Sequence, residues 1–519
     1  MSIDTSMLAQ RGGTQPAIQR FNRTRKAISG LAEDGTPIGP GWFDPQVVSL
    51  AHGEGVRRPH SSVVAAGVRA LVDSVESSLD NYRYLKPFKA LDDKLTETYI
   101  AEGIDAQTAG NLCLDSGNTR LFFGFFHAVA EPGSIFLVPR AYYQAINMWC
   151  DISDVQLRWV DTSADNDYKL TADDLESWYD RNVRQGIGVA PRGILLFNPG
   201  YTGSVYQPHE LAALAEFVER QNLVVLEDSI FSNTEFEGYR TTHLASFDGM
   251  AQRVVTINGG SKAYGLANIR IGWGCGPKAI IDRMNYYTMA TSITVPHLAK
   301  AMALAALEAP RAYLDGNIRE CMTRAALVED LMTEVNQQVA DAVGFEPRIP
   351  FFRVAHQPKA AHSTLVSGNG MAGLRLPDGS TITDSVDVTR HFLQQGKVCF
   401  SPALSNGFDD CTVRVAFGCL GWEHTYPETR LADTRAAVHV LLKEMPFGTD
   451  ETELLARMRA AGIDPAWNCR EDTNEGFALG REVIREAFTH RIAPVAVRLA
   501  EANRQLLAVE APELVSRGR

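Results

Sequence analysis

Four consecutive apolar residues, Leu223-Val224-Val225-Leu226, stand directly before Glu227 and Asp228. A short apolar run without polar alternation is typical of a strand that is buried on both faces, as in a parallel sheet covered by helices. Further strand patterns recur at 111–115, 134–138, 155–160, 193–198 and 253–258, and helical or loop stretches separate them. The alternation predicts an α/β fold with a mostly parallel central sheet.

Length and composition limit the class of protein. The chain has 519 residues, 45% hydrophobic and 22% charged, which is long enough for two lobes and ordinary for a folded protein. The formal net charge of −12 disfavours nonspecific binding to nucleic acid or to anionic membranes. Eight dispersed cysteines without a Cys-x-x-Cys pair indicate reduced thiols rather than a disulfide or metal framework. No segment reaches the roughly 18 apolar residues of a membrane span, so we expect a cytoplasmic protein.

Changes of pattern divide the chain into four parts. Residues 1–60 form an N-terminal arm with a strand-like segment at 47–51, and residues 61–320 form the large domain. A smaller α+β domain is expected over 321–445, joined by the arm, and a helical C-terminal extension over 446–519. The small domain is expected to contain strands at 374–376, 397–400 and 412–417 and a helix at 425–444.

Three charged residues follow the central strands. Asp228 comes at the carboxyl end of the apolar strand, where α/β proteins place ligands. Lys262 lies in Gly-Gly-Ser-Lys-Ala-Tyr-Gly (259–265), and Arg270 follows eight positions later. These are the groups needed to hold pyridoxal 5′-phosphate (PLP): an amine for its aldehyde, a carboxylate for its ring nitrogen and a guanidinium for its phosphate.

Other residues can complete this site. The turn Ser116-Gly117-Asn118-Thr119 joins a strand to a helix, so its free backbone N–H groups can bind phosphate, with Ser261 beside them. Tyr143 follows a strand and can stack on the cofactor ring. Each residue alone also has an ordinary explanation, because lysines are mostly solvated and strand-end aspartates commonly cap helices. The joint pattern favours the cofactor site.

Segments 198–203, 227–228 and 261–273 resemble the class I/II aminotransferases of the fold-type-I PLP enzymes, over roughly residues 45–445. The resemblance implies an aminotransferase-like large domain and an amino acid substrate. It also implies a homodimer with shared active sites, in which Tyr84 reaches the neighbour's phosphate.

The same resemblance assigns roles to individual residues. Lys262 would form the imine with the cofactor, and Asp228 would pair with its pyridine nitrogen. Arg414 would hold the substrate α-carboxylate. The remaining expected contacts are Ser116, Gly117, Asn118, Ser261 and Arg270 for the phosphate, Tyr143 for the ring, and Asn198 and Glu54 for the substrate.

The chain departs from the family pattern at four positions. The usual Asn-Pro-Thr-Gly reads Gly200-Tyr201-Thr202-Gly203, the tyrosine three residues after the aspartate is Phe231, the serine three before the lysine is Gly259, and the small domain's Pro-Gly is Pro402-Ala403. Two donors to the cofactor's phenolic oxygen are lost, and Gly200 is expected to vacate volume beside the ring. These changes suggest a reaction other than transamination.

Residues 48–51 and Glu54 resemble a region of aminocyclopropane-carboxylate synthases, which act on S-adenosylmethionine; Glu54 is otherwise a solvated loop residue. Elimination or replacement at Cβ or Cγ of an amino acid, including carbon–carbon bond formation in specialised metabolism, is therefore the first hypothesis. The alternative is an ordinary aminotransferase that uses a 2-oxo acid. A noncatalytic regulator is disfavoured, because the arm lacks a basic helix-turn-helix. No metal-ligand spacing was found.

Overall fold

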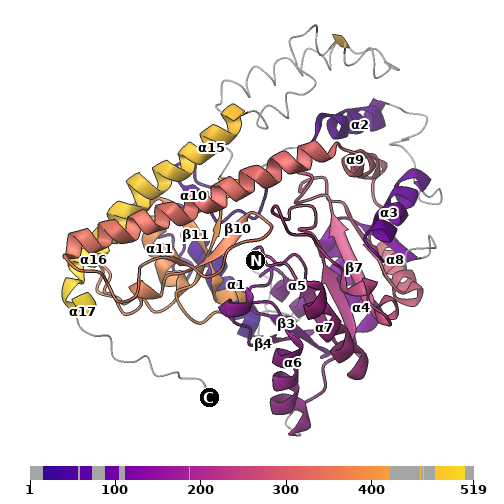
Figure 1. Ribbon diagram of the computed structural model, residues 1–519, viewed down its shortest axis with the longest axis horizontal. Helices are drawn as coiled ribbons and strands as arrows, with labels where there is room; N and C mark the ends of the chain where they lie inside the picture. Colours follow the sequence, from indigo (N-terminus) through magenta and orange to yellow (C-terminus); the bar gives the residue numbers. More distant parts are fainter. Residues whose placement is uncertain are drawn as a thin grey trace, which may run out of the picture.

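The computed structural model describes residues 16–55, 59–72, 88–104, 111–185, 188–420, 456–457, 460 and 474–508. Two sheets and the helices around them make up this part of the chain (Figure 1). The predicted helix at 425–444 and Tyr84 lie outside the described residues.

The large sheet has seven strands in the order β2-β8-β7-β6-β5-β3-β4. Only β8 runs antiparallel to its neighbours, so the sheet is mostly parallel, as the sequence predicts. The strands are β2 (Leu112–Asp115), β3 (Ile135–Pro139), β4 (Gln156–Val160), β5 (Gly193–Phe197), β6 (Val224–Asp228), β7 (Val254–Gly259) and β8 (Gly272–Cys275).

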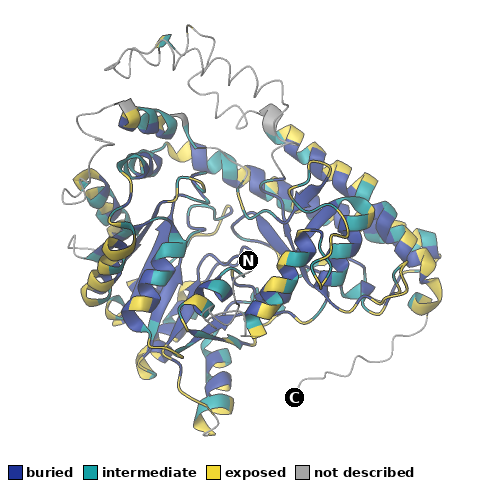
Figure 2. Ribbon diagram, turned by 180° about the vertical axis from the view of Figure 1, so that it is seen from behind, coloured by how far each residue is buried: buried dark blue, intermediate teal, exposed yellow. Residues whose placement is uncertain are grey.

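Helices cover both faces of this sheet, which explains the apolar run before Asp228. Val225 belongs to the core on one face, with Leu211 and Leu214 of α7, whereas Leu226 belongs to the core on the other, with Phe122 of α4. The strands are buried while the outward faces of the helices are exposed (Figure 2). These helices are α2 (Ser61–Val72), α3 (Lys89–Ala101), α4 (Asn118–Val129), α5 (Ile146–Ile152), α6 (Ala172–Tyr179), α7 (Pro208–Arg220), α8 (Lys278–Ser292) and α9 (His297–Leu307).

The second sheet has five strands in the order β1-β11-β12-β10-β9. Its strand β1 comes from the N-terminal arm and pairs in parallel with β11, which brings the loop after β1 toward the large sheet. Its strands are β1 (Val48–Leu50), β9 (Arg353–Val354), β10 (Ser363–Ser367), β11 (Val398–Pro402) and β12 (Val413–Ala416).

Helix α10 (Arg311–Val343) and the C-terminal helices share one core with the second sheet. Figure 1 shows α15 and α16 beside α10, and their contacts agree. Residues Ile484, Phe488 and Ile492 of the predicted extension are fully buried in that core. The other helices of this half are α1 (Pro16–Ile28), α11 (Ser385–Gly396), α15 (Asn474–Glu486), α16 (Ala493–Ala502) and α17 (Arg504–Ala508).

Some expected elements differ from the structure. The segment 374–376 forms only a single bridge, Arg375 to Thr381, and is not a strand. Strands β8, β9 and β10 were not predicted from the sequence. For β8 the reason is its composition, since this glycine-rich segment has no apolar pattern. The predicted boundary at 320/321 falls inside the unbroken helix α10, and the division into domains stays a prediction. No helix in the described segments is long and apolar enough to cross a bilayer.

Candidate active site

The loop after β1 brings three distant side chains together at Gly53. The amine of Lys262 donates a hydrogen bond to the Gly53 carbonyl oxygen at 2.6 Å. A Cβ placed on Gly53 would lie 3.7 Å from the Lys262 Nζ, 3.8 Å from the Arg414 Nη1 and 3.9 Å from the Tyr201 hydroxyl. The absence of a side chain at Gly53 therefore leaves room between the amine, the guanidinium and the phenol.

Arg414 lies in β12, between β10 and β11, and is buried. Its Nη2 donates to the Ala51 carbonyl oxygen, and its guanidinium carbon lies 4.7 Å above the centre of the Tyr201 ring. Its Nε and Nη1 have no hydrogen-bond partner among the described residues. A buried guanidinium with unpaired donors is costly unless an anion joins it, so it fits a carboxylate ligand.

Asp228 ends β6 and is buried. Its Oδ1 accepts hydrogen bonds from the Asn118 side-chain amide at 2.9 Å and from the Ile230 backbone N–H at 3.1 Å. Burial raises its pKa to about 7, against the effect of these two hydrogen bonds and of the Lys262 charge. A partner with a positive charge would favour the ionised carboxylate, and a protonated pyridine nitrogen is such a partner.

A turn with the geometry expected of an anion site precedes α4. Gly117 has a φ of 83°, and Arg270 packs against it, so that a Cβ at Gly117 would lie 2.4 Å from the Arg270 Nη2. The guanidinium also lies 3.5 Å from the Ser116 carbonyl oxygen. Backbone N–H groups at the start of α4 therefore stand next to a guanidinium, as a phosphate requires. Ser261, directly before Lys262, is half-buried.

Tyr143 follows the carboxyl end of β3, and Asp228 lies at the carboxyl end of the parallel strand β6. Its ring centre is 5.3 Å from that of Tyr201, whose hydroxyl faces Gly53. The Tyr143 side chain is 38% exposed and lines a cavity of about 670 Å³ together with Trp42 and Phe43 of the arm. The side chain is therefore partly accessible, and stacking on a cofactor stays a prediction.

Of two predicted substrate contacts, Asn198 is engaged elsewhere, whereas Glu54 lies near enough to Lys262 for their charges to interact. The Asn198 side-chain amide donates to the Thr242 carbonyl oxygen at 2.7 Å and approaches Glu227 at 3.3 Å, so it does not join the groups around Gly53. The Glu54 carboxylate is half exposed and lies 3.7 Å from the His52 Nδ1. Burial opposes the charge of Glu54, but Lys262 and His52 lower its pKa.

At two positions where the chain departs from the family pattern, Gly200 and Gly259, neighbouring atoms leave little space for a side chain. A Cβ at Gly200 would lie 2.1 Å from the Ser204 hydroxyl, so Ser204 fills that space. The expectation that Gly200 leaves volume beside the cofactor ring is therefore wrong. A Cβ at Gly259 would lie 2.8 Å from the Ile271 carbonyl oxygen and 2.9 Å from the Asn118 side-chain oxygen, so a serine would not fit there without a shift.

His362 is a further residue of this site that was not predicted from the sequence. This buried side chain hydrogen-bonds through Nε2 to the Gly53 carbonyl oxygen at 2.9 Å, and its ring packs edge-on against Phe231, 5.3 Å away. Burial, with the nearby Lys262 charge, lowers the pKa of His362 to about 3. It is therefore a neutral donor to Gly53. No signal marks it in the sequence, because its position depends on the pairing of β10.

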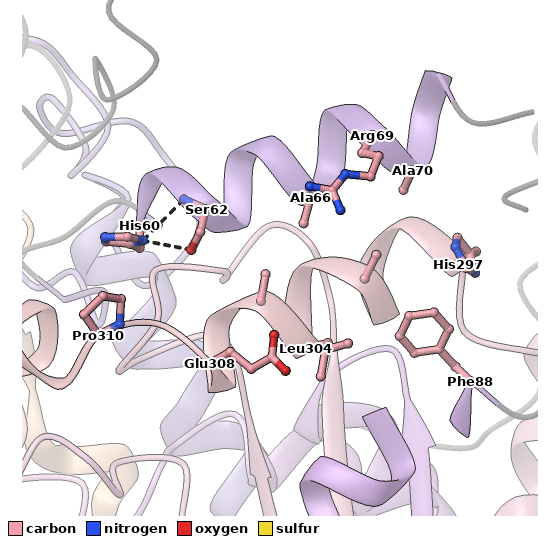
Figure 3. Close-up of a pocket in the computed structure, with 12 residues that line it drawn as sticks. His60, Ser62, Ala66, Arg69, Ala70, Phe88, His297, Leu304, Glu308 and Pro310 are labelled. Atoms are coloured by element: carbon pink, nitrogen blue, oxygen red, sulfur yellow. Dashed lines mark hydrogen bonds between the residues drawn. The ribbon is translucent and has the colours of Figure 1, made fainter. Parts of the chain in front are cut away.

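A separate cavity of about 580 Å³ lies between α2 and α9, where His60, Arg69 and His297 are among its lining residues (Figure 3). None of its lining residues belongs to the cluster around Gly53, so this cavity is not the candidate active site.

The residues present fit pyridoxal phosphate. An amine, a buried carboxylate and a turn suited to an anion surround one region, and a guanidinium with two nitrogens unpaired among the described residues borders it. When bound, the cofactor withdraws electrons from the Cα of an amino acid. Among the described residues, no group of His, Cys, Asp and Glu is placed to hold a metal ion.

Comparison with known proteins agrees with this chemistry. The family described as aminotransferase class I and II matches residues 45–367. A probable aspartate/prephenate aminotransferase of Rickettsia conorii is 22% identical over 365 residues, which are 70% of this chain and 84% of the relative. A bifunctional aspartate aminotransferase and glutamate/aspartate-prephenate aminotransferase of Petunia hybrida is 25% identical over 72% of this chain and 73% of the relative.

Solved structures share the fold. The aspartate aminotransferase of Rhizobium meliloti superposes with a TM-score of 0.63 at 20% identity, over 86% of this chain and 99% of that one. The aspartate aminotransferase of Thermus thermophilus with maleate superposes with a TM-score of 0.59 at 19% identity, over 87% of this chain and 100% of that one. The chain belongs to the aminotransferase class I and II family and is a PLP-dependent enzyme.

Proposed function

We propose that this enzyme is an aminotransferase, which moves the amino group of an α-amino acid to a 2-oxo acid. The observation that carries the proposal is the meeting of the Lys262 amine and the Arg414 guanidinium at Gly53. An α-amino acid has a carboxylate and an amine on one carbon. If Arg414 holds that carboxylate, the bond from Cα to its proton is brought close to Lys262.

Each of the three charged residues has a role in this proposal. The free donors of Arg414 orient the substrate by its carboxylate. Lys262 takes the proton from Cα, since burial lowers the pKa of its amine, although Glu54 opposes this, and a neutral amine accepts protons. The Asp228 carboxylate keeps the cofactor's ring nitrogen protonated.

Relatives support transamination over elimination. Those described above are named aspartate or prephenate aminotransferases, and nothing in the comparisons supports a substrate of the S-adenosylmethionine type. Two of the departures that suggested another reaction, Gly200 and Gly259, have packing explanations. Phe231 remains unusual, since its ring lies 5.9 Å from the Lys262 Nζ and offers no hydrogen-bond donor.

A single-turnover experiment tests the reaction type. Purified holoenzyme is mixed with one L-amino acid at a time, beginning with aspartate, without any oxo acid. We expect one equivalent of 2-oxo acid and conversion of the bound cofactor to pyridoxamine phosphate, detected by mass spectrometry, and turnover should continue only when an oxo acid is added. Lys262→Ala should abolish the conversion, and Lys262→Arg, which keeps the charge but not the primary amine, should do the same.

A different result would point to elimination. Release of methylthioadenosine from S-adenosylmethionine without added oxo acid, with no pyridoxamine phosphate formed, would contradict the proposal.

We further propose that the enzyme works as a homodimer in the cytoplasm. Tyr286 and Met289 near the end of α8, and Ile293 directly after it, are 61%, 51% and 43% exposed. An exposed apolar stripe of this kind is typical of an interface. Sedimentation velocity should show a dimer, which Met289→Asp should weaken; a monomeric wild type would contradict the proposed dimer.

The seven free cysteines in the described part of the chain suit a reducing compartment, which supports the proposed location in the cytoplasm.

A further inference from the structure

The side chain of Asn118 does not face the phosphate turn in which it stands. Its amide nitrogen donates to the Asp228 Oδ1 at 2.9 Å, and the Ile230 backbone N–H donates to the same oxygen at 3.1 Å. Both donors therefore hold one oxygen of the carboxylate. The other oxygen, Oδ2, has no hydrogen-bond partner among the described residues.

Two glycines make the space that this amide occupies. Gly259 and Gly272 are register partners in β7 and β8. A Cβ on Gly259 would lie 2.9 Å from the Asn118 Oδ1, and a Cβ on Gly272 would lie 2.8 Å from it. Both strands thus lack side chains beside the amide. A side chain at either position would crowd both the Asn118 amide and the backbone beside it, since a Cβ on Gly259 would also lie 2.8 Å from the Ile271 carbonyl oxygen.

The amide has no other evident task. Its Oδ1 is buried without a hydrogen-bond partner in the described part of the chain. A buried orphan acceptor is unfavourable, so the amide is not placed there for its own hydrogen bonding. The contact that it does make is with Asp228, at the point where the proposed function needs an ionised carboxylate of defined orientation.

We propose that Asn118 is a positioning residue: it holds Asp228 Oδ1 from the side, so that the free Oδ2 faces the ring nitrogen of the cofactor. An amide N–H can only donate, so it favours the ionised carboxylate. This matters because burial raises the pKa of Asp228 to about 7, so that near neutral pH small changes around the carboxyl group alter its charge. The inference rests on the role proposed for Asp228.

The test is the protonation state of the cofactor's ring nitrogen, followed by NMR of enzyme reconstituted with PLP labelled with ¹⁵N at that atom. In Asn118→Ala we expect the ring nitrogen to lose its proton at a pH about one unit lower than in wild type, and PLP to bind about tenfold more weakly. A purely structural role would change the melting temperature without moving this titration. Gly259→Ser, which keeps the asparagine at position 118 but crowds its side chain, should shift the titration in the same direction.

Asp228→Asn separates the two failures. If the titration is unchanged in Asn118→Ala and Gly259→Ser while Asp228→Asn removes the ring proton, the inference is overturned and the role of Asp228 stands. If Asp228→Asn leaves the ring proton in place, the role proposed for Asp228 fails as well.

Discussion

At the residue scale, Arg414 combines a structural cost with a functional gain. Among the described residues, two of its three guanidinium nitrogens are buried without hydrogen-bond partners, and the Tyr201 ring and the Ala51 carbonyl oxygen are the contacts that compensate. Folding alone would favour an apolar side chain at this position in the core of the small sheet. The arginine is explained by an anion that is present only when substrate binds.

Replacing Arg414 should therefore separate affinity from stability. We expect Arg414→Met to raise KM for the amino acid about 100-fold, the equivalent of about 3 kcal/mol for a lost charged pair. The melting temperature of the substrate-free enzyme should not fall, because a buried unpaired charge is removed.

Arg414→Lys is the matched control for that prediction. It keeps the charge but not the planar fork, and should give an intermediate KM. Unchanged KM in both variants, measured by steady-state kinetics at saturating oxo acid, would show that Arg414 does not hold the substrate.

At the element scale, the start of α4 shows why a turn of small residues is needed there. Gly117 combines a positive φ with a close approach of Arg270. The positive φ lets the chain reverse from β2 into α4, and the missing Cβ lets the guanidinium approach the helix N-terminus. The turn thus brings backbone N–H groups and a guanidinium to one place.

Gly117→Ala should be harmful for both reasons. The positive φ should cost about 1–2 kcal/mol of stability, and displacement of Arg270 should weaken PLP binding about tenfold or more. Thermal denaturation and cofactor titration measure the two effects.

Gly373→Ala supplies the comparison, because Gly373 has a φ of 82° with no atom within 4 Å of its added Cβ. It should show the backbone cost without the loss of cofactor. Equal PLP affinity in both variants would mean that the contact between Gly117 and Arg270 does not serve the phosphate.

At the scale of the whole molecule, α10 joins the two halves. Its first turn, with Tyr313 and Leu314, belongs to the core of the large sheet, and its later turns belong to the core of the small one. Arg324 of α10 donates to the Phe417 and Gly418 carbonyl oxygens, just after β12. Helix α15 closes over Arg324, so the C-terminal extension supports the strand that carries Arg414.

Global stability should also depend on His243, a buried side chain that lies between two carboxylates, Glu227 of β6 and Glu102. The His243 Nδ1 lies 3.5 Å from Glu227 and its Nε2 lies 3.3 Å from Glu102. Burial opposes a charge on His243, but Glu227 and Glu102 raise its pKa to about 10. The stabilisation is therefore complete below the unfolded pKa of about 6.5 and is lost as the pH rises toward 10.

His243→Gln should lower the free energy of unfolding by about 3 kcal/mol at pH 6 and by clearly less near pH 10. Denaturant unfolding of wild type and variant at both pH values measures the difference. A loss of equal size at both pH values would show that His243 stabilises the fold through packing and neutral hydrogen bonds instead.

Much of the seven-stranded sheet was predictable because the patterns that specify its strands are local. The apolar run before Asp228 indicated a strand covered on both faces, and the structure places it in the middle of the sheet. The family pattern around Lys262 is equally local. By contrast, β8 has no pattern of its own and forms only because β2 and β7 pair with it.

The sequence by itself determined the α/β fold, the family and the kinds of chemical group in the site. Each of these follows from a hydrophobic period or a motif that is contained in a short stretch of the chain. Only the tertiary structure decided which groups meet. Gly53, Lys262, His362 and Arg414 come from both halves of the molecule and converge through strand pairing and packing. Such contacts depend on long-range register, and no local pattern specifies it.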